Sequence, residues 1–309
     1  MIVYLTSTLI LVILVAIAGL ALNLQWGLGG LINFGLFGFY MLGAYVCGLL
    51  TVAGLSPWWA MIAAMLASAV VCALVSLISI RLSEDYLAIV TLGFAECLRI
   101  VIRNESGLTR GPQGLPGIAR PFMQGLGPLN GDAVFLILCL ACLVVVLLVF
   151  QAIARSAFGR TLRCIREDPL VASALGRNVM AFRVKAFAIG GGMIGLAGSL
   201  HAFYYTYIDP TQFTTIITAY AFLVVMMGGR GSAPGLLLSA FTVVFVLEGS
   251  RFLSATGAWL DASKLAGIRL IVVGSALIAI LRFRATGFFT EYRLRVAGRG
   301  DTPASGASS

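Results

Sequence analysis

The chain has 309 residues, of which 60% are apolar and only 11% are charged. An ordinary soluble domain carries about 25% charged residues, so a soluble protein of this composition could not cover its apolar surface. The composition therefore argues against a soluble enzyme, a nucleic-acid-binding domain and a disordered protein, despite a net charge of +9. The 36 glycines instead favour closely packed helices in lipid.

The first 80 residues contain no charged side chain, and Arg81 is the first. A helix needs about 20 apolar residues to cross the hydrocarbon core of a membrane. The apolar segments are continuous and do not alternate as barrel strands do. We therefore predict an all-α integral membrane protein, a polytopic bundle of about eight to ten transmembrane helices.

Nine segments are long or apolar enough to be predicted as membrane helices, although Thr215–Gly228 is short for a full crossing. The segment Leu28–Leu55 contains seven glycines, which predicts a broken helix or a re-entrant segment there. The nine segments are Leu5–Leu24, Leu28–Leu55, Pro57–Ile80, Tyr86–Ile102, Ala133–Ala154, Val184–Tyr205, Thr215–Gly228, Ala233–Phe252 and Leu265–Leu281.

The distribution of Lys and Arg predicts the orientation in the membrane. Alternating the nine segments places 14 basic residues on one side, in the 155–185 connection, the tail and two shorter connections, and six on the other. The basic side is expected to be cytoplasmic, so the positive charge reflects topology and not a nucleic-acid partner. We expect one transmembrane domain over residues 1–282 and a cytoplasmic tail over residues 283–309 with a disordered end.

The 155–185 connection contains a short helix that is specified at both ends. Asp168 is a good N-cap, Pro169 suits the first helical position and Gly176 suits the residue after the last turn. Its apolar residues Leu170, Val171, Ala174 and Leu175 share one face. An isolated helix of two turns is not stable in water. It either rests on its own transmembrane bundle or docks on a cytoplasmic partner.

Several polar residues lie within the predicted spans. Asn23, Gln25 and Asn33 flank the Gly-rich break, where free backbone groups could meet a substrate. Glu96 and Arg99 are three residues apart and are expected to pair, either for function or to orient the helix. Glu248 and Arg251 are interpreted as an interfacial pair, and His201, the single histidine, as a packed or interfacial residue.

Motifs for catalysis and for cofactor binding are not found. The sequence has no P-loop and no H-E-x-x-H, G-x-S-x-G or EF-hand pattern. Cys139 and Cys142 form a C-x-x-C without a second pair, so we interpret them as small buried hydrophobic residues and expect no metal site. We expect a protein that is not an enzyme and carries no cofactor of its own.

The order of motifs over most of the chain resembles the LivM-type membrane subunit of ABC importers for branched-chain amino acids. No single motif is specific, but their order over about 250 residues is. The motifs are Gly19-Leu-Ala-Leu-Asn23-Leu24, Asn33-Phe-Gly35, Gly43-Ala-Tyr45, Tyr86-Leu-Ala-Ile-Val-Thr91-Leu-Gly-Phe-Ala-Glu96 with Arg99, Leu108-Thr-Arg-Gly-Pro-Gln-Gly-Leu115, Gly159-Arg160, Ile165-Arg166-Glu167-Asp168, Ala174-Leu175-Gly176 and Gly228-Gly229-x-Gly231-Ser232.

The resemblance implies a bacterial inner-membrane complex with a second permease subunit, two cytoplasmic ABC ATPases that bind ATP, and an extracellular or periplasmic substrate-binding protein. It implies that the short helix couples this chain to an ATPase. The predicted coupling residues are Arg163, Arg166, Glu167, Asp168, Pro169, Leu170, Ala174, Leu175 and Gly176. The predicted translocation-path residues are Asn23, Gln25, Asn33, Gly35, Thr91, Glu96 and Arg99.

Alternative functions remain open on the sequence. The same permease class could move urea, short amides or other amino acids. An ion-coupled secondary transporter would need several buried carboxylates, and only Glu96 fits that role well. A membrane-embedded enzyme would need a nucleophile with a base, or a set of metal ligands, and one histidine argues against both.

Overall fold

The computed structural model describes residues 2–78, 84–121 and 128–255, together with positions 267, 271 and 275. Over these residues the chain is almost entirely helical, with two short strands. The elements are α1 (Ile2–Leu22), a π-helical turn (Asn23–Leu28), α2 (Leu36–Val52), α3 (Pro57–Ile78), α4 (Glu84–Asn104), a 3-10 turn (Gly111–Gln113), β1 (Leu115–Pro116), α5 (Pro128–Arg155), α6 (Ala157–Glu167), α7 (Pro169–Ala174), α8 (Val179–Tyr205), β2 (Tyr207–Ile208), α9 (Thr215–Gly228) and α10 (Ala233–Ala255).

Eight of the nine predicted segments correspond to helices in the described residues, which confirms the all-α membrane fold. Four helical stretches are long and apolar enough to cross a membrane, and three further apolar helices are shorter. The ninth segment, Leu265–Leu281, and the tail 283–309 lie outside the described residues. The four long stretches are Val3–Leu28, Pro57–Ile78, Gly131–Arg155 and Val179–Tyr205; the three shorter ones are Leu36–Val52, Thr215–Gly228 and Ala233–Glu248.

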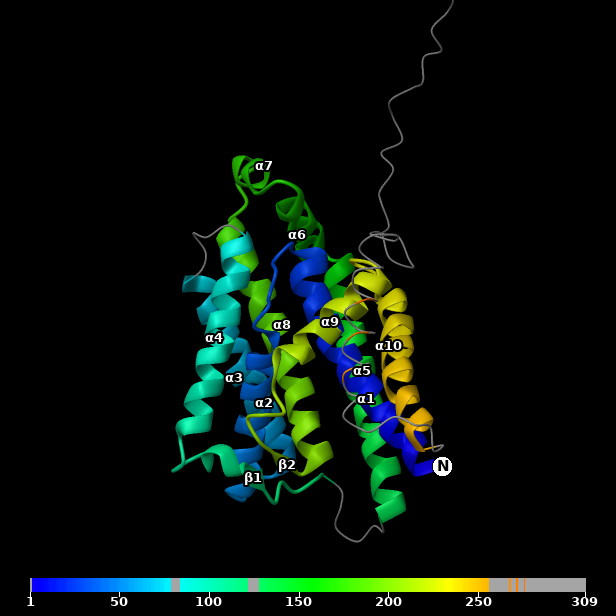
Figure 1. The fold of residues 1–309 in the computed structure, drawn as a ribbon. Coiled ribbons are helices and arrows are strands. Elements are labelled where there is room, and N and C mark those ends of the chain that lie inside the picture. Colours follow the sequence, from blue (N-terminus) through cyan, green and yellow to red (C-terminus); the bar gives the residue numbers. More distant parts are fainter. Residues whose placement is uncertain are drawn as a thin grey trace, which may run out of the picture.

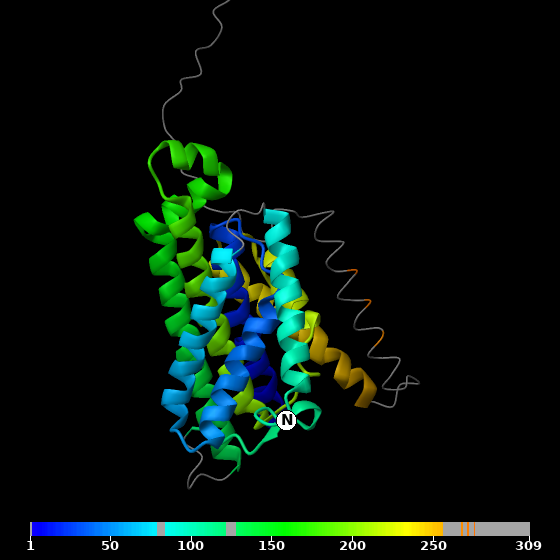
Figure 2. The ribbon, with the colours of Figure 1, turned by 90° about the vertical axis from the view of Figure 1, so that its left-hand side faces the viewer.

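The helices form one bundle with two distinct ends (Figures 1 and 2). α6 and α7 project from one end, which we call the α6–α7 end. The antiparallel pair of β1 and β2, with Leu115 opposite Ile208, lies at the other, which we call the β1–β2 end. The N-terminus lies at the β1–β2 end (Figure 1).

The Gly-rich segment after α1 is a broken crossing and not a re-entrant loop. The chain leaves the π-helical turn, runs without regular structure through Gly35, and becomes helical again at Leu36. Gly30 lies against Arg166 of α6, whereas Gly48 of α2 lies against Ile118 and Ile208 near the β1–β2 pair. The segment therefore passes from one end of the bundle to the other, and we call residues 23–35 the broken segment.

α8 is the central helix and packs mainly against α2 and α3. Its glycines permit this approach, as the small-residue spacing predicts. A Cβ atom on Gly198 would lie 2.0 Å from the carbonyl oxygen of Tyr40, and one on Gly195 would lie 2.6 Å from Ser68 Cβ. These contacts leave no space for a side chain, so the three helices form a close-packed core.

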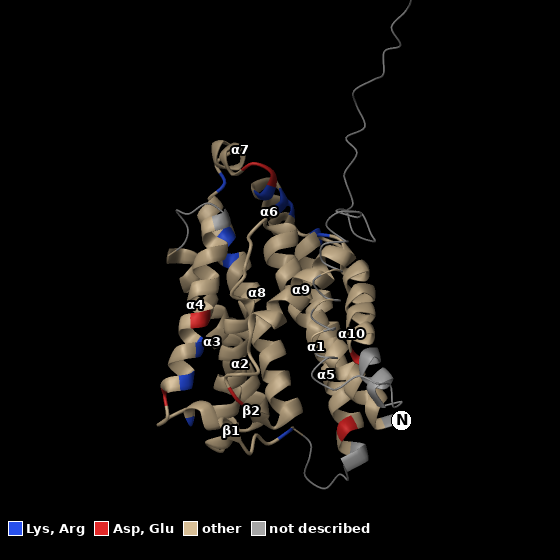
Figure 3. Ribbon diagram, viewed as in Figure 1, with Lys and Arg blue, Asp and Glu red and all other residues tan. Residues whose placement is uncertain are grey.

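Apart from those on α4, most charged residues lie towards the ends of the bundle (Figure 3). The α6–α7 end carries the basic residues of the 155–185 connection and Arg230. At the β1–β2 end, Arg120 forms an ion pair with Asp132 at 2.8 Å and donates to the carbonyl oxygens of Phe203 and Tyr204. This arginine fixes the connection before α5 to the end of α8.

Candidate functional site

The predicted short helix in the 155–185 connection forms as α7, with both of its predicted caps. Asp168 Oδ1 accepts hydrogen bonds from the backbone N–H groups of Leu170 at 2.8 Å and Val171 at 3.1 Å. At the other end Gly176 has a φ of +76°. The N–H groups of Gly176 and Arg177 donate to the carbonyls of Ser173 and Ala172, which is the Schellman arrangement.

The apolar face of α7 points away from the chain's own bundle. Leu170 is 78% exposed and Leu175 is 71% exposed, and Val171 and Ala174 are exposed as well. Only Ala172 of this helix is buried. The expectation that this face could rest on its own bundle is therefore not met among the described residues. Two large apolar side chains in this position form a small surface without a covering element.

Two features of the connection were not predicted. α6 (Ala157–Glu167) is a full helix with Ser156 as its N-cap, and α8 begins at Val179, five residues before the predicted start. α6 buries Gly159, Leu162 and Ile165 on one face and presents its polar residues on the other. A three-turn amphipathic helix without a long apolar run gives only a weak signal in a membrane sequence.

Arg166 links α6 to the broken segment. Its Nη1 atom donates to the carbonyl oxygen of Gly27, and a Cβ atom on Gly30 would lie 2.8 Å from Arg166 Cγ. Arg163, one turn earlier on α6, is half-buried, and Glu167 is exposed. A movement of α6 would thus be transmitted directly to residues 27–30.

The three polar residues of the broken segment are fully buried, and Asn23 and Gln25 bond to other elements, whereas Asn33 bonds to Gln25. Asn23 Oδ1 accepts from the N–H group of Gly231 at 2.8 Å, and its Nδ2 donates to the Ser232 carbonyl at 3.3 Å. Gln25 Nε2 donates to the Phe187 carbonyl at 3.3 Å, and Asn33 Nδ2 donates to Gln25 Oε1 at 2.9 Å. These bonds hold an irregular backbone between α8 and the α9–α10 turn.

Aromatic rings surround the start of the broken segment. The rings of Trp26 and Phe34 each lie 5.1 Å from the ring of Phe222 on α9. The guanidinium carbon of Arg230 lies 4.2 Å from the centre of the Trp26 ring, within the range of a cation–π contact. We call Trp26, Phe34 and Phe222 the aromatic cluster. It fills the space between the broken segment and α9.

Gly35 and Thr91 lie in contact where α2 begins inside the bundle. A Cβ atom on Gly35 would lie 2.0 Å from the carbonyl oxygen of Thr91. Next to it, the N–H group of Phe37 donates to Oγ1 of Thr218 in the first turn of α9 at 3.1 Å. The N-terminal ends of α2 and α9 therefore meet within the bundle.

Glu96 and Arg99 form the predicted ion pair on α4, with both carboxylate oxygens accepting from the guanidinium. The side chain of Glu96 is 43% exposed and that of Arg99 is 24% exposed, so the pair faces outward. It is not brought together with Asn23, Gln25 and Asn33. The predicted path residues thus fall into three places: the broken segment, the Gly35–Thr91 contact and the outer face of α4.

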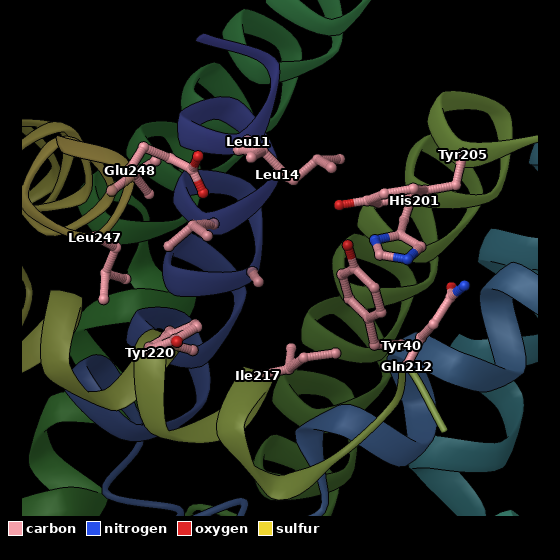
Figure 4. A pocket seen from close by; sticks show the side chains of 14 residues that line it. Leu11, Leu14, Tyr40, His201, Tyr205, Gln212, Ile217, Tyr220, Leu247 and Glu248 are labelled. Atoms are coloured by element: carbon pink, nitrogen blue, oxygen red, sulfur yellow. The ribbon is translucent and has the colours of Figure 1, made fainter. Parts of the chain in front are cut away.

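A cavity of about 290 Å³ lies between α1, α8, α9 and α10, towards the β1–β2 end. Tyr40, His201 and Tyr205 form one wall, and Tyr220 and Glu248 form the wall opposite (Figure 4). The other lining residues are Leu11, Leu14, Val15, Ala18, Gln212, Ile217, Ala221, Val244 and Leu247.

The cavity residues were missed as a group. His201 was interpreted as packed or interfacial and Glu248 as the partner of Arg251, whose side chain lies outside the described residues. His201 and Tyr205 are four residues apart and so share a helix face, which was the one local signal available. The remaining polar groups come from other helices, and only the fold brings them together.

Most of the chain matches the model of a known protein family. The family model for the permease component of branched-chain amino acid transport systems covers residues 4–281. The chain belongs to this family of membrane permeases.

Its relatives include two kinds of permease subunit. The chain is 35% identical to the high-affinity branched-chain amino acid permease LivM of Salmonella typhimurium and 34% identical to LivM of Escherichia coli, over 79% of the chain and 62% of each relative. It is 26% identical to LivH of Escherichia coli, over 72% of the chain and 77% of that protein. The aligned part thus spans less than two thirds of the LivM proteins. No solved structure matches the chain.

Proposed function

We propose that this chain is the membrane-spanning permease subunit of an ATP-driven importer that moves leucine, isoleucine and valine. Membership of the permease family and the similarity to LivM proteins over most of the chain support this proposal. The observation in the structure that carries it is α7, a capped helix that presents Leu170, Val171 and Leu175 outside the bundle.

The α6–α7 end is the cytoplasmic end in this proposal. Basic residues are favoured on the cytoplasmic side of a membrane protein, and this end carries the basic residues of the 155–185 connection. The N-terminus is then outside, and a further span over Leu265–Leu281 returns the C-terminus to the cytoplasm. The membrane is the inner membrane of a bacterium.

α7 docks on a cytoplasmic ABC ATPase. That ATPase binds the ATP, because the sequence of this chain has no P-loop. The exposed apolar face supplies the contact area, and Asp168, Pro169 and Gly176 keep the helix formed while it is displaced. α6 follows α7 because only Asp168 separates them. Arg166 then transmits the displacement to Gly27 and Gly30, which moves the broken segment and the aromatic cluster.

The translocation path runs beside the broken segment and alternates between outside-open and inside-open states. Asn23 and Gln25 tie the broken segment to the α9–α10 turn and to α8. Gly35 and Thr91 allow α2 and α4 to slide in close contact, and the aromatic cluster closes the inner side. A second permease subunit completes the path. The outward Glu96–Arg99 pair supports a partner at α4, since a charged group facing lipid near the middle of a helix costs a few kcal/mol.

A second candidate is the same permease class with another cargo: a different amino acid, urea or a short amide. The substrate-binding protein contributes much of the selectivity for the cargo. The permease chain alone therefore determines only part of that selectivity. An ion-coupled transporter is a third possibility, although the family match does not support it. Sensitivity of uptake to ATP depletion at a clamped membrane potential separates this last possibility from the first two.

Uptake of labelled leucine tests the proposal directly. The comparison is between cells that lack this gene and the same cells with the gene restored, in a strain without other leucine transport. We expect uptake only in the restored cells, with competition by isoleucine and valine. Equal uptake in both strains would remove leucine as the cargo and direct attention to amides, urea or other amino acids.

A further inference from the structure

We propose that the cavity between α1, α8, α9 and α10 is a binding site for a zwitterionic aliphatic amino acid within the translocation path. The inference rests on the proposed function, because it assigns the cargo to particular residues. Its volume of about 290 Å³ is at the lower end for ligand sites, which are about 300–1,000 Å³. The cavity is therefore suited to a ligand as small as a single amino acid.

One side of the cavity is apolar. α1 contributes Leu11, Leu14, Val15 and Ala18, and α9 and α10 add Ile217, Ala221, Val244 and Leu247. Aliphatic and small residues dominate this side, and the described lining contains no phenylalanine or tryptophan. Burial of a branched aliphatic side chain here is favourable because it removes apolar surface from water.

The opposite end is polar and is formed by packed rings. The His201 ring contacts Tyr40 at 5.4 Å and Tyr205 at 4.6 Å between ring centres, and Phe213 packs behind it at 5.3 Å. The Tyr40 and Tyr205 hydroxyl groups project toward the cavity in Figure 4. These hydroxyls can donate hydrogen bonds to a carboxylate. The described lining contains no Lys or Arg that could bind a carboxylate instead.

His201 and Gln212 lie side by side at this end, with Nε2 of His201 and Oε1 of Gln212 both buried. Each of these side chains has hydrogen-bonding capacity that a bound ligand can use. A ligand that brings its own donors and acceptors would therefore find polar partners at this end. The ammonium and carboxylate groups of an amino acid supply both kinds of group.

One acidic side chain of the lining favours a ligand that carries an ammonium group. Glu248 is half-buried and reaches in from α10, opposite the His201 wall (Figure 4). It is the one acidic side chain among the described lining residues. A carboxylate here attracts an ammonium group and repels a free carboxylic acid anion, and it gives an uncharged amide or urea no such ion pair.

α9 joins the cavity to the aromatic cluster. Tyr220 and Ala221 line the cavity, and the next residue, Phe222, contacts Trp26 and Phe34. A shift of α9 that separates Phe222 from Trp26 would therefore also move one wall of the cavity. In the proposed orientation, the cavity thus lies on the extracellular side of the contact between Phe222 and Trp26. A displacement of Arg166 and the broken segment would open that contact.

The test is the substrate preference of the assembled transporter in proteoliposomes, measured by competing leucine and valine uptake. Ala221→Leu narrows the apolar side, and Ala219→Leu is the matched control on the same helix outside the lining. Ile217→Ala widens the apolar side of the cavity. Its control is Ile216→Ala, because the neighbouring Ile216 side chain is exposed. One methylene group in an apolar pocket changes selectivity by roughly 10-fold or more.

We expect Ala221→Leu to lower the leucine-to-valine ratio of kcat/KM by roughly 10-fold, Ile217→Ala to raise it, and both controls to retain the wild-type ratio. If the wild-type complex transports leucine and both cavity variants keep its ratio, the cavity is not the site. If the wild-type complex transports no branched-chain amino acid, the proposed function itself fails. Should Ala221→Leu not assemble, the Ile217 pair alone decides.

Discussion

α7 and the broken segment distribute apolar and polar side chains in opposite ways. In α7 the large apolar residues Leu170 and Leu175 are 78% and 71% exposed. In the broken segment Asn23, Gln25 and Asn33 are completely buried. Exposed apolar surface is typical of an interaction site, whereas the amide groups of Asn23 and Gln25 and the Nδ2 atom of Asn33 form hydrogen bonds inside the bundle. In the proposed function the first region binds another protein, whereas the second holds an irregular backbone between helices.

The central core should be the region least tolerant of change. Gly198→Ala places a Cβ atom 2.0 Å from the Tyr40 carbonyl oxygen, and a backbone atom cannot move away as a side chain can. We expect a loss of at least about 3 kcal/mol in stability, the upper end for overpacking. The measurement is the amount of folded protein in the membrane and its melting temperature in detergent.

Gly93→Ala in α4 is the matched control, because a Cβ atom there meets nothing within 4 Å. The control should keep the wild-type yield. A Gly198→Ala protein with wild-type yield and melting temperature would show that α2 and α8 are not in the close contact described.

Arg166 should connect the two regions. Arg166→Gln removes a charge-assisted hydrogen bond to the Gly27 carbonyl, an interaction worth about 1.5–3 kcal/mol. We expect transport to fall roughly 10-fold, which corresponds to about 1.4 kcal/mol, while ATP hydrolysis continues. Arg160→Gln on the same helix is the control, since Arg160 is exposed and its side chain donates to the nearby Arg155 carbonyl oxygen within the described residues. Equal transport by the two variants would remove Arg166 from the transmission path.

Asn23 should have a smaller effect, confined to stability. Asn23→Ala leaves the Gly231 N–H group without its acceptor, at a cost of about 1–3 kcal/mol. We expect a lower melting temperature with little change in the transport rate of the protein that folds. Asn104→Ala, at an exposed position at the end of α4, should leave the melting temperature unchanged. A rate defect in a fully stable Asn23→Ala protein would instead place this residue on the path.

The two regions also differ in how far the sequence predicts them. The helix α7 could be predicted with its caps, because Asp168, Pro169 and Gly176 act within a few residues of one another. The membrane segments could be predicted from apolar length alone. The hydrogen bond between Asn23 and Gly231 could not be predicted from the sequence, because more than 200 residues separate them. The cavity was missed for the same reason, since Tyr40, His201 and Glu248 become neighbours only in the folded bundle.

The central claim is that α7 joins the transport cycle to a cytoplasmic ATPase. The most direct measurement is ATP-driven leucine uptake by the reconstituted complex with Leu175→Asp, alongside Ser173→Ala as a control on the same exposed helix. We predict that Leu175→Asp inserts and folds normally but loses substrate-stimulated ATP hydrolysis and uptake, because a charge cannot enter an apolar contact. Normal uptake by a stable Leu175→Asp protein would contradict the account.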